Sequence, residues 1–179
     1  LNSWLNDVDY DRSQFKESAV GFKLMFAQLE LFPSLVEWIV KNQISIVCLY
    51  RENLLKQYIS DVAKNKRGYA HSVAETRKVL IHLDIDECLY QIALRDRSNR
   101  VLQELFPDNP QILLTYEDFF QKMETEGARI FRFLEVEDLP IQRPPMTKQS
   151  SNQLEDLIEN YEELSKKLKA TAYYRFLDT

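Results

Sequence analysis

Short apolar runs along the chain predict three buried β-strands. Residues 44–50 form a run rich in β-branched side chains with no polar alternation, which is typical of a strand buried on both faces of a parallel sheet. Residues 111–115 (QILLT) follow a turn-forming segment and predict a second strand of this kind. Residues 19–26 predict a third, interrupted by Lys23. These runs predict an α/β fold with a parallel sheet of few strands.

Apolar residues at steps of three and four predict helices between and after these strands. The first helix covers residues 34–41, directly after Pro33, and is the expected crossover between the strands at 19–26 and 44–50. The second begins after Asn53, whose side-chain oxygen can accept a free N–H group of the first helical turn.

Three further helices are predicted in the second half of the chain. After a brief extended piece at 79–83, Asp84 or Asp86 can cap a long helix that reaches about residue 105. Another helix follows the strand at 111–115 and reaches about residue 134. The clearest helical pattern covers 154–168, with Ser151 or Asn152 as its cap, and the aromatic C-terminal segment is expected to dock on the core.

The junction between the strand at 44–50 and the next helix carries candidate binding chemistry. Arg51 ends the predicted strand, and Ser60 lies about two turns into the helix. Ligands of parallel α/β sheets bind at the carboxyl ends of the strands, and a helix N-terminus favours phosphate. Local chemistry leaves an alternative open, in which Arg51 pairs with Glu52 or another carboxylate and Ser60 faces a neighbouring carbonyl.

Composition restricts the classes of function. With 179 residues the chain predicts one domain, 1–179, of ordinary globular composition. The net charge of −5 argues against nucleic-acid binding, and no apolar run is long enough for a membrane span. Neither the two cysteines nor His71 and His82 have metal-type spacing, so no metal is expected. His82 is expected to pack in its extended segment. Two reduced thiols and the absence of a signal-like start predict a cytoplasmic protein.

The segment LYRENLLKQYIS, residues 49–60, resembles the 3′-phosphate-binding segment of sulfotransferases that use 3′-phosphoadenosine 5′-phosphosulfate, in particular the bacterial branch. In that family an Arg ending a strand and a Ser in the following helix hold the 3′-phosphate of the nucleotide. The resemblance implies these roles for Arg51 and Ser60, although their spacing of nine residues is longer than in many family members.

Other segments extend this resemblance over most of residues 19–177. The first predicted strand is similar to one that delivers a Lys and, two residues later, a catalytic His; Lys23 matches the Lys, and Met25 stands in place of the His. YEDF at 116–119 resembles an element whose Tyr lies against adenine, which implies that role for Tyr116. Lys148 matches a lysine in a loop that closes over the nucleotide, and ENYEEL with the aromatic C-terminus resembles the end of the bacterial domains.

The resemblance implies a P-loop-NTPase-like parallel sheet flanked by many helices, and a sulfotransferase. The donor would be 3′-phosphoadenosine 5′-phosphosulfate, the acceptor a hydroxyl or amine of a small molecule, sugar or lipid, and no metal would be needed. Lys23 would face the transferring group, and the general base is unassigned. The family's Gly-rich 5′-phosphosulfate loop has no counterpart, since Gly21, Gly68 and Gly127 lie in other contexts. We therefore expect an N-terminally incomplete domain that alone is a poor or inactive catalyst.

Two other interpretations remain open. A nucleoside or nucleotide kinase-like P-loop domain would share the parallel sheet and phosphate-binding arginines, but it needs a GxxxxGK[ST] sequence, which the chain lacks. A non-catalytic, degenerate relative that uses its helices for protein contacts is favoured by the absent loop and the absent His. The sequence does not distinguish acceptors or oligomeric states.

Overall fold

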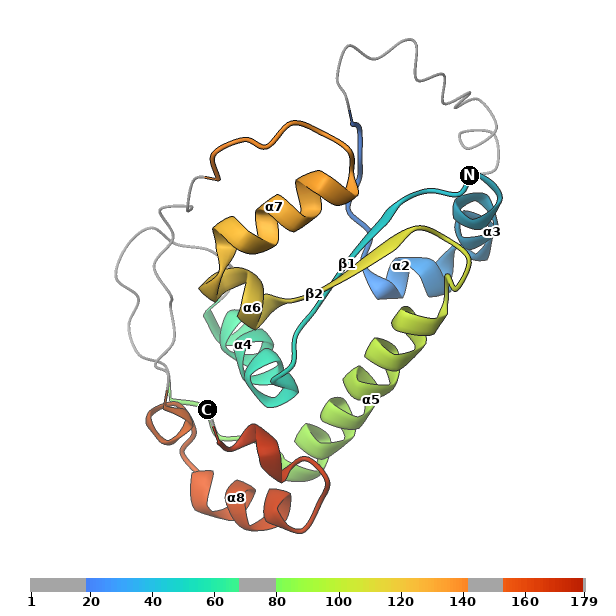
Figure 1. Cartoon of the computed structure of the whole chain (residues 1–179). Coiled ribbons are helices and arrows are strands. Elements are labelled where there is room, and N and C mark those ends of the chain that lie inside the picture. The colour runs from blue at the N-terminus through green and yellow to red at the C-terminus, as the bar shows by residue number, and fades with distance from the viewer. Residues whose placement is uncertain (1–18, 68–79, 142–152, 179) are drawn as a thin grey trace.

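A computed structural model of the chain describes residues 19–67, 80–141 and 153–178 (Figure 1). Two strands and seven α-helices make up most of this part of the chain, which gives it mixed α/β character. In chain order the elements are α2 (Phe26–Leu31), α3 (Pro33–Lys41), β1 (Ile46–Tyr50), α4 (Leu54–Arg67), α5 (Ile85–Glu104), β2 (Gln111–Thr115), α6 (Tyr116–Gln121), α7 (Met123–Phe133), the 3-10 helix η2 (Leu154–Asp156), α8 (Tyr161–Lys169) and the 3-10 helix η3 (Tyr174–Phe176).

The two strands form a parallel sheet through the middle of the molecule (Figure 1). Their register runs from Ile46 opposite Gln111 to Tyr50 opposite Thr115. Because the strands are parallel, both carboxyl ends lie at the same edge, where α4 and α6 begin. The strands predicted at 44–50 and 111–115 are thus confirmed.

The strand predicted at 19–26 is wrong. Residues 19–25 form neither a helix nor a strand and pair with no described strand, and α2 starts at Phe26. The side-chain oxygen of Gln28 accepts the backbone N–H of Met25 at 2.7 Å, which closes the first turn of this helix. Lys23 is exposed and Leu24 is partly buried against the smaller hydrophobic cluster. Without a strand here, the segment does not form the expected strand–helix–strand unit with α3 and β1.

Burial of β1 on both faces is also wrong. Cys48 is buried, whereas Val47 and Leu49 are 40% and 53% exposed. Alternate residues of a strand point to opposite faces, so one face of β1 is only partly covered by the part of the chain described here. A run without polar residues therefore did not indicate burial on both sides.

Two hydrophobic clusters hold the helices, and α5 belongs to both. Its N-terminal half contributes Cys88 and Ile92 to the larger cluster, which also contains α4, α8 and η3 residues. Its last turn contributes Leu102 to a smaller cluster around α2 and α3. With 20 residues, α5 spans roughly 30 Å and joins these two ends of the molecule, as Figure 1 shows. Its polar middle is left to face the sheet edge.

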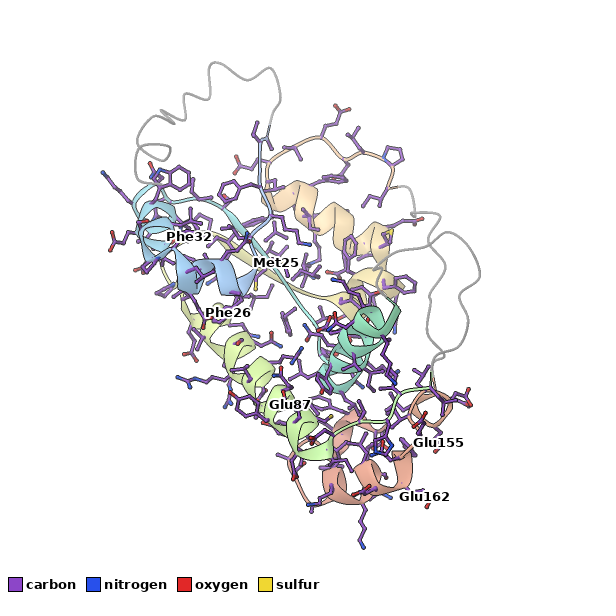
Figure 2. All side chains as sticks on the ribbon, turned by 180° about the vertical axis from the view of Figure 1, so that it is seen from behind. Met25, Phe26, Phe32, Glu87, Glu155 and Glu162 are labelled. Atoms are coloured by element: carbon purple, nitrogen blue, oxygen red, sulfur yellow. The ribbon has the colours of Figure 1, made fainter. Side chains whose placement is uncertain are left out.

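The predicted helix over 154–168 is interrupted. Ile81 donates to the Leu157 carbonyl and accepts from the Glu159 N–H, both at 2.9 Å, in a short parallel bridge. The Asn160 side chain also binds both backbone groups of Leu83, at 2.9 and 3.0 Å. Because the Leu157 carbonyl and the Glu159 N–H bond to Ile81 and not within a helix, η2 ends before this bridge and α8 begins after it. Glu155 and Glu162, on either side of the break, are labelled in Figure 2.

The predicted helix after β2 divides at Lys122, where α6 ends and α7 begins. Two predicted N-caps are confirmed. The Asn53 side-chain oxygen accepts the N–H of Lys56 at 2.9 Å, and that of Asp84 accepts the N–H of Glu87 at 3.0 Å. The C-terminal segment docks as expected, with Phe176 buried against the larger cluster.

Candidate functional site: a cavity at the carboxyl end of β1

A cavity of about 460 Å³ opens where β1 ends and α4 begins. Its walls come from four places that are distant in the sequence: the end of β1 and start of α4, the middle of α5, the first turn of α6, and η3. It therefore lies at the sheet edge where ligands of parallel α/β sheets bind. The lining residues are Tyr50, Arg51, Glu52, Asn53, Leu54, Asp96, Asn99, Arg100, Gln103, Glu117, Arg175 and Phe176.

Arg51 lies in the wall of this cavity, with 23% of its side chain exposed. Its Nε is 3.6 Å from a carboxylate oxygen of Glu117, and its guanidinium carbon is 4.7 Å from the ring centre of Tyr116. The Nε atom is buried and makes no hydrogen bond. Arg51 thus pairs with a carboxylate, as the alternative interpretation expected, and it also has open space beside it.

Glu117 connects the two strand ends. Its carboxylate accepts the backbone N–H groups of Glu52 at 3.0 Å and of Asn53 at 3.3 Å, just before α4. A carboxylate here also suits the start of α6, where the helix dipole favours negative charge. The two parallel strands end at the same edge of the sheet. Glu117, two residues after the end of β2, can therefore reach the backbone that follows β1, a contact that the sequence alone did not reveal.

The middle of α5 forms the opposite wall. Asp96, Asn99, Arg100 and Gln103 lie along one side of the helix. The Asn99 amide donates to the Arg51 carbonyl at 3.4 Å, and Arg100 pairs with Asp96 at 3.0 Å. Sequence reasoning missed these residues, because residues 95–100 are polar at every position and do not show which side of the helix faces a site.

The ionic groups that line the cavity balance. The lining includes three cations, Arg51, Arg100 and Arg175, and three carboxylates, Glu52, Asp96 and Glu117. Arg51 pairs with Glu117 and Arg100 with Asp96, so an anion that enters competes with carboxylates for these two guanidinium groups. Burial, followed by the nearby charge of Glu52, raises the pKa of the Tyr50 phenol, which stays a hydrogen-bond donor at neutral pH.

The other predicted site residues lie outside this wall. Tyr116 contacts Arg51, is 40% exposed and stacks on Phe120 with ring centres 6.1 Å apart. Ser60 is on an exposed part of α4 and is not among the described residues that line the cavity. Lys23 is exposed in the segment before Met25, which Figure 2 labels at the beginning of α2. Lys148 lies outside the described residues.

The expectation that His82 packs inside is wrong. The side chains of Ile81 and Leu83 are buried, so the alternation of an extended chain turns His82 outward, where its Nδ1 is 3.6 Å from Glu159. His71 lies outside the described residues. Cys48 and Cys88 are both buried and unpaired, and burial raises the pKa of the Cys88 thiol to about 12.

Within the described ranges no group of acidic, histidine and cysteine side chains has a metal-binding arrangement. None of the helices described is long and apolar enough to cross a membrane. Comparison of the chain with protein-family models, with curated proteins and with solved structures finds no match.

Proposed function

We propose that the cavity at the end of β1 binds the 3′-phosphate of an adenine nucleotide, and that the chain is the nucleotide-binding portion of a P-loop-like sulfotransferase using 3′-phosphoadenosine 5′-phosphosulfate. The observation that carries this proposal is the guanidinium of Arg51 at the carboxyl end of a parallel strand, beside a cavity of about 460 Å³. The sequence resemblance in residues 49–60 supports the same role for it.

The residues around Arg51 fit a phosphate monoester and a base. The Arg51 side chain is partly exposed in the cavity wall, and a phosphate oxygen is an acceptor that a guanidinium binds in a strong, charge-assisted hydrogen bond. Tyr116 contacts Arg51 and is partly exposed, and the resemblance implies that its ring lies near the adenine, although the same ring also stacks on Phe120. In this proposal Ser60 and Lys148 add phosphate contacts on the strength of the resemblance alone.

The donor would supply an activated sulfuryl group for transfer to an acceptor hydroxyl or amine. The chain's own contribution is to bind and orient the nucleotide through Arg51 and Tyr116. Lys23 is proposed to face the transferring group, but it lies outside the cavity wall, and Met25 cannot accept a proton. The proposal therefore concerns binding first and expects little or no catalysis by residues 1–179 alone.

Calorimetric titration with three nucleotides tests the proposal. The chain should bind 3′-phosphoadenosine 5′-phosphate more tightly than AMP, and Arg51→Ala should abolish this preference. Arg97→Ala is the matched control, because Arg97 is an exposed arginine on α5 that is not among the described cavity residues. Tighter binding of ATP than of the 3′-phosphorylated nucleotide would instead support the kinase-like alternative.

A second candidate is a non-catalytic module that uses its surface for protein contacts. The observation that favours it is the ion pair between Arg51 and Glu117, which gives Arg51 a structural partner inside the fold. This candidate predicts that the chain ignores all three nucleotides and that Arg51→Ala lowers stability without changing any binding. The same titration separates the two candidates.

A further inference from the structure

The carboxylate of Glu117 lies where an oxyanion would bind. It accepts the N–H groups of Glu52 and Asn53, at 3.0 and 3.3 Å, and one of its oxygens is 3.6 Å from Arg51 Nε. Two backbone donors in sequence before a helix, with a guanidinium beside them, are the groups that proteins use to hold phosphate or sulfate. In this structure the fold itself supplies the anion.

The surroundings indicate that this contact is displaceable. Glu117 is 28% exposed and is one of the residues lining the open cavity, so its side chain has space to rotate into. It projects from α6, while the groups that hold it come from the end of β1, so breaking the contact leaves both strands in register. The Nε of Arg51 makes no hydrogen bond to Glu117, so at this atom the two side chains attract each other by charge alone.

We infer that Glu117 is an autoinhibitory anion, which occupies the oxyanion position at the end of β1 and must leave before the cavity accepts a ligand phosphate. The inference rests on the proposed function for the identity of that ligand as a phosphate monoester. Since the guanidinium of Arg51 lies beside Glu117, release of Glu117 is the step that leaves this guanidinium available. Affinity is thereby set by competition between an internal and an external anion.

The Glu117→Gln variant tests this competition. A glutamine keeps one acceptor oxygen, so one of the two backbone N–H groups can still be bound while the competing charge is removed. We expect this variant to bind 3′-phosphoadenosine 5′-phosphate about tenfold or more tightly than the unchanged chain. The double variant Glu117→Gln with Arg51→Ala should lose the gain.

The control is Asp118→Asn, which removes the same charge from the adjacent position. Asp118 is exposed and pairs with Lys122 at 2.8 Å rather than with Arg51, so this variant should leave the affinity unchanged. Thermal unfolding of each variant establishes that it is folded. Backbone amide signals of Glu52 and Asn53 locate the event, because they should shift with added inorganic phosphate in Glu117→Gln and much less in the unchanged chain.

The outcomes separate this inference from the proposed function. If the unchanged chain binds the nucleotide through Arg51 and folded Glu117→Gln binds no more tightly, the autoinhibitory role is refuted and the proposed function stands. If no form binds the nucleotide but Glu117→Gln binds inorganic phosphate at Glu52 and Asn53, the inference stands and the proposed ligand is wrong. If no form binds either anion, both are refuted.

Discussion

Asn53 joins the start of α4 to the C-terminal end of the chain. Its side-chain oxygen caps α4 at the N–H of Lys56, and its amide nitrogen donates to the Phe176 carbonyl at 3.1 Å. Only 4% of the residue is exposed. An Asn at this position therefore satisfies backbone groups of two segments that would otherwise be buried without partners.

We expect Asn53→Ala to lower the free energy of unfolding by about 2–4 kcal/mol, because both a helix cap and a buried hydrogen bond are lost. Urea unfolding followed by circular dichroism measures the change. Asn65→Ala is the control, since Asn65 is an exposed residue near the end of the same helix. Equal small losses in the two variants would show that Asn53 has no such connecting role.

Asp118 should contribute stability that depends on pH. Hydrogen bonds from Lys122 and then from Thr115 hold the pKa of its carboxyl below the ordinary value of 3.8. A pKa that is lower in the folded state means that the stabilisation is complete above the unfolded pKa and is lost as pH falls through the folded pKa. The difference in urea midpoint between the unchanged chain and Asp118→Asn should thus narrow below pH 3.8. A gap that stays constant between neutral and acidic pH would contradict this origin.

At the scale of elements, β1 and β2 differ in how deeply they are buried. Leu49 and Leu114 are opposite each other in the parallel register, yet Leu49 is 53% exposed and Leu114 only 2%. The cost of truncating a side chain follows the packing that it loses, so these two leucines form a matched pair within one sheet.

We expect Leu114→Ala to lower the free energy of unfolding by about 2–5 kcal/mol, and Leu49→Ala by about 1 kcal/mol or less. Denaturant unfolding of the two variants under the same conditions measures both. A large loss for Leu49→Ala would mean that the exposed face of β1 is covered in solution, as burial on both faces would require.

Local signals predicted the elements that local forces determine. The apolar runs at β1 and β2, the proline at the start of α3 and the caps at Asn53 and Asp84 all act within a few residues of their position in the sequence. The interruption between η2 and α8 has a different cause. The backbone near Asn160 bonds to the segment around Ile81, and a contact over that separation leaves no mark in helical periodicity.

The same distinction explains the candidate site. Arg51 could be singled out as a candidate because it ends a recognisable strand, and Tyr116 through the resemblance of YEDF to a nucleotide-binding element. Glu117, Arg100 and Arg175 could not be assigned to the cavity, since α5, α6 and η3 meet there only through tertiary packing. Lys23 was predicted to lie in a strand because its neighbours are apolar. In the structure, α2 begins at Phe26, within the predicted strand, and no strand forms before it.

At the scale of the whole molecule, the cavity lies between the two hydrophobic clusters. The polar middle of α5 faces it, and the ends of α5 are fixed in different clusters, so the wall containing Asn99 and Arg100 is held from both sides. The residues after both strands meet there as well. Because several elements build this site, we expect substitutions in any of these elements to alter its ligand affinity.

A thermodynamic cycle between Arg51 and the 3′-phosphate tests most directly whether this cavity binds a nucleotide phosphate. Binding of 3′-phosphoadenosine 5′-phosphate and of AMP is measured by calorimetry for the unchanged chain and for Arg51→Ala. We predict a coupling free energy of about 1.5–3 kcal/mol, because the 3′-phosphate and the guanidinium would interact directly. A coupling of zero, with both nucleotides affected equally or not bound at all, would contradict the assignment of this cavity as a nucleotide phosphate site.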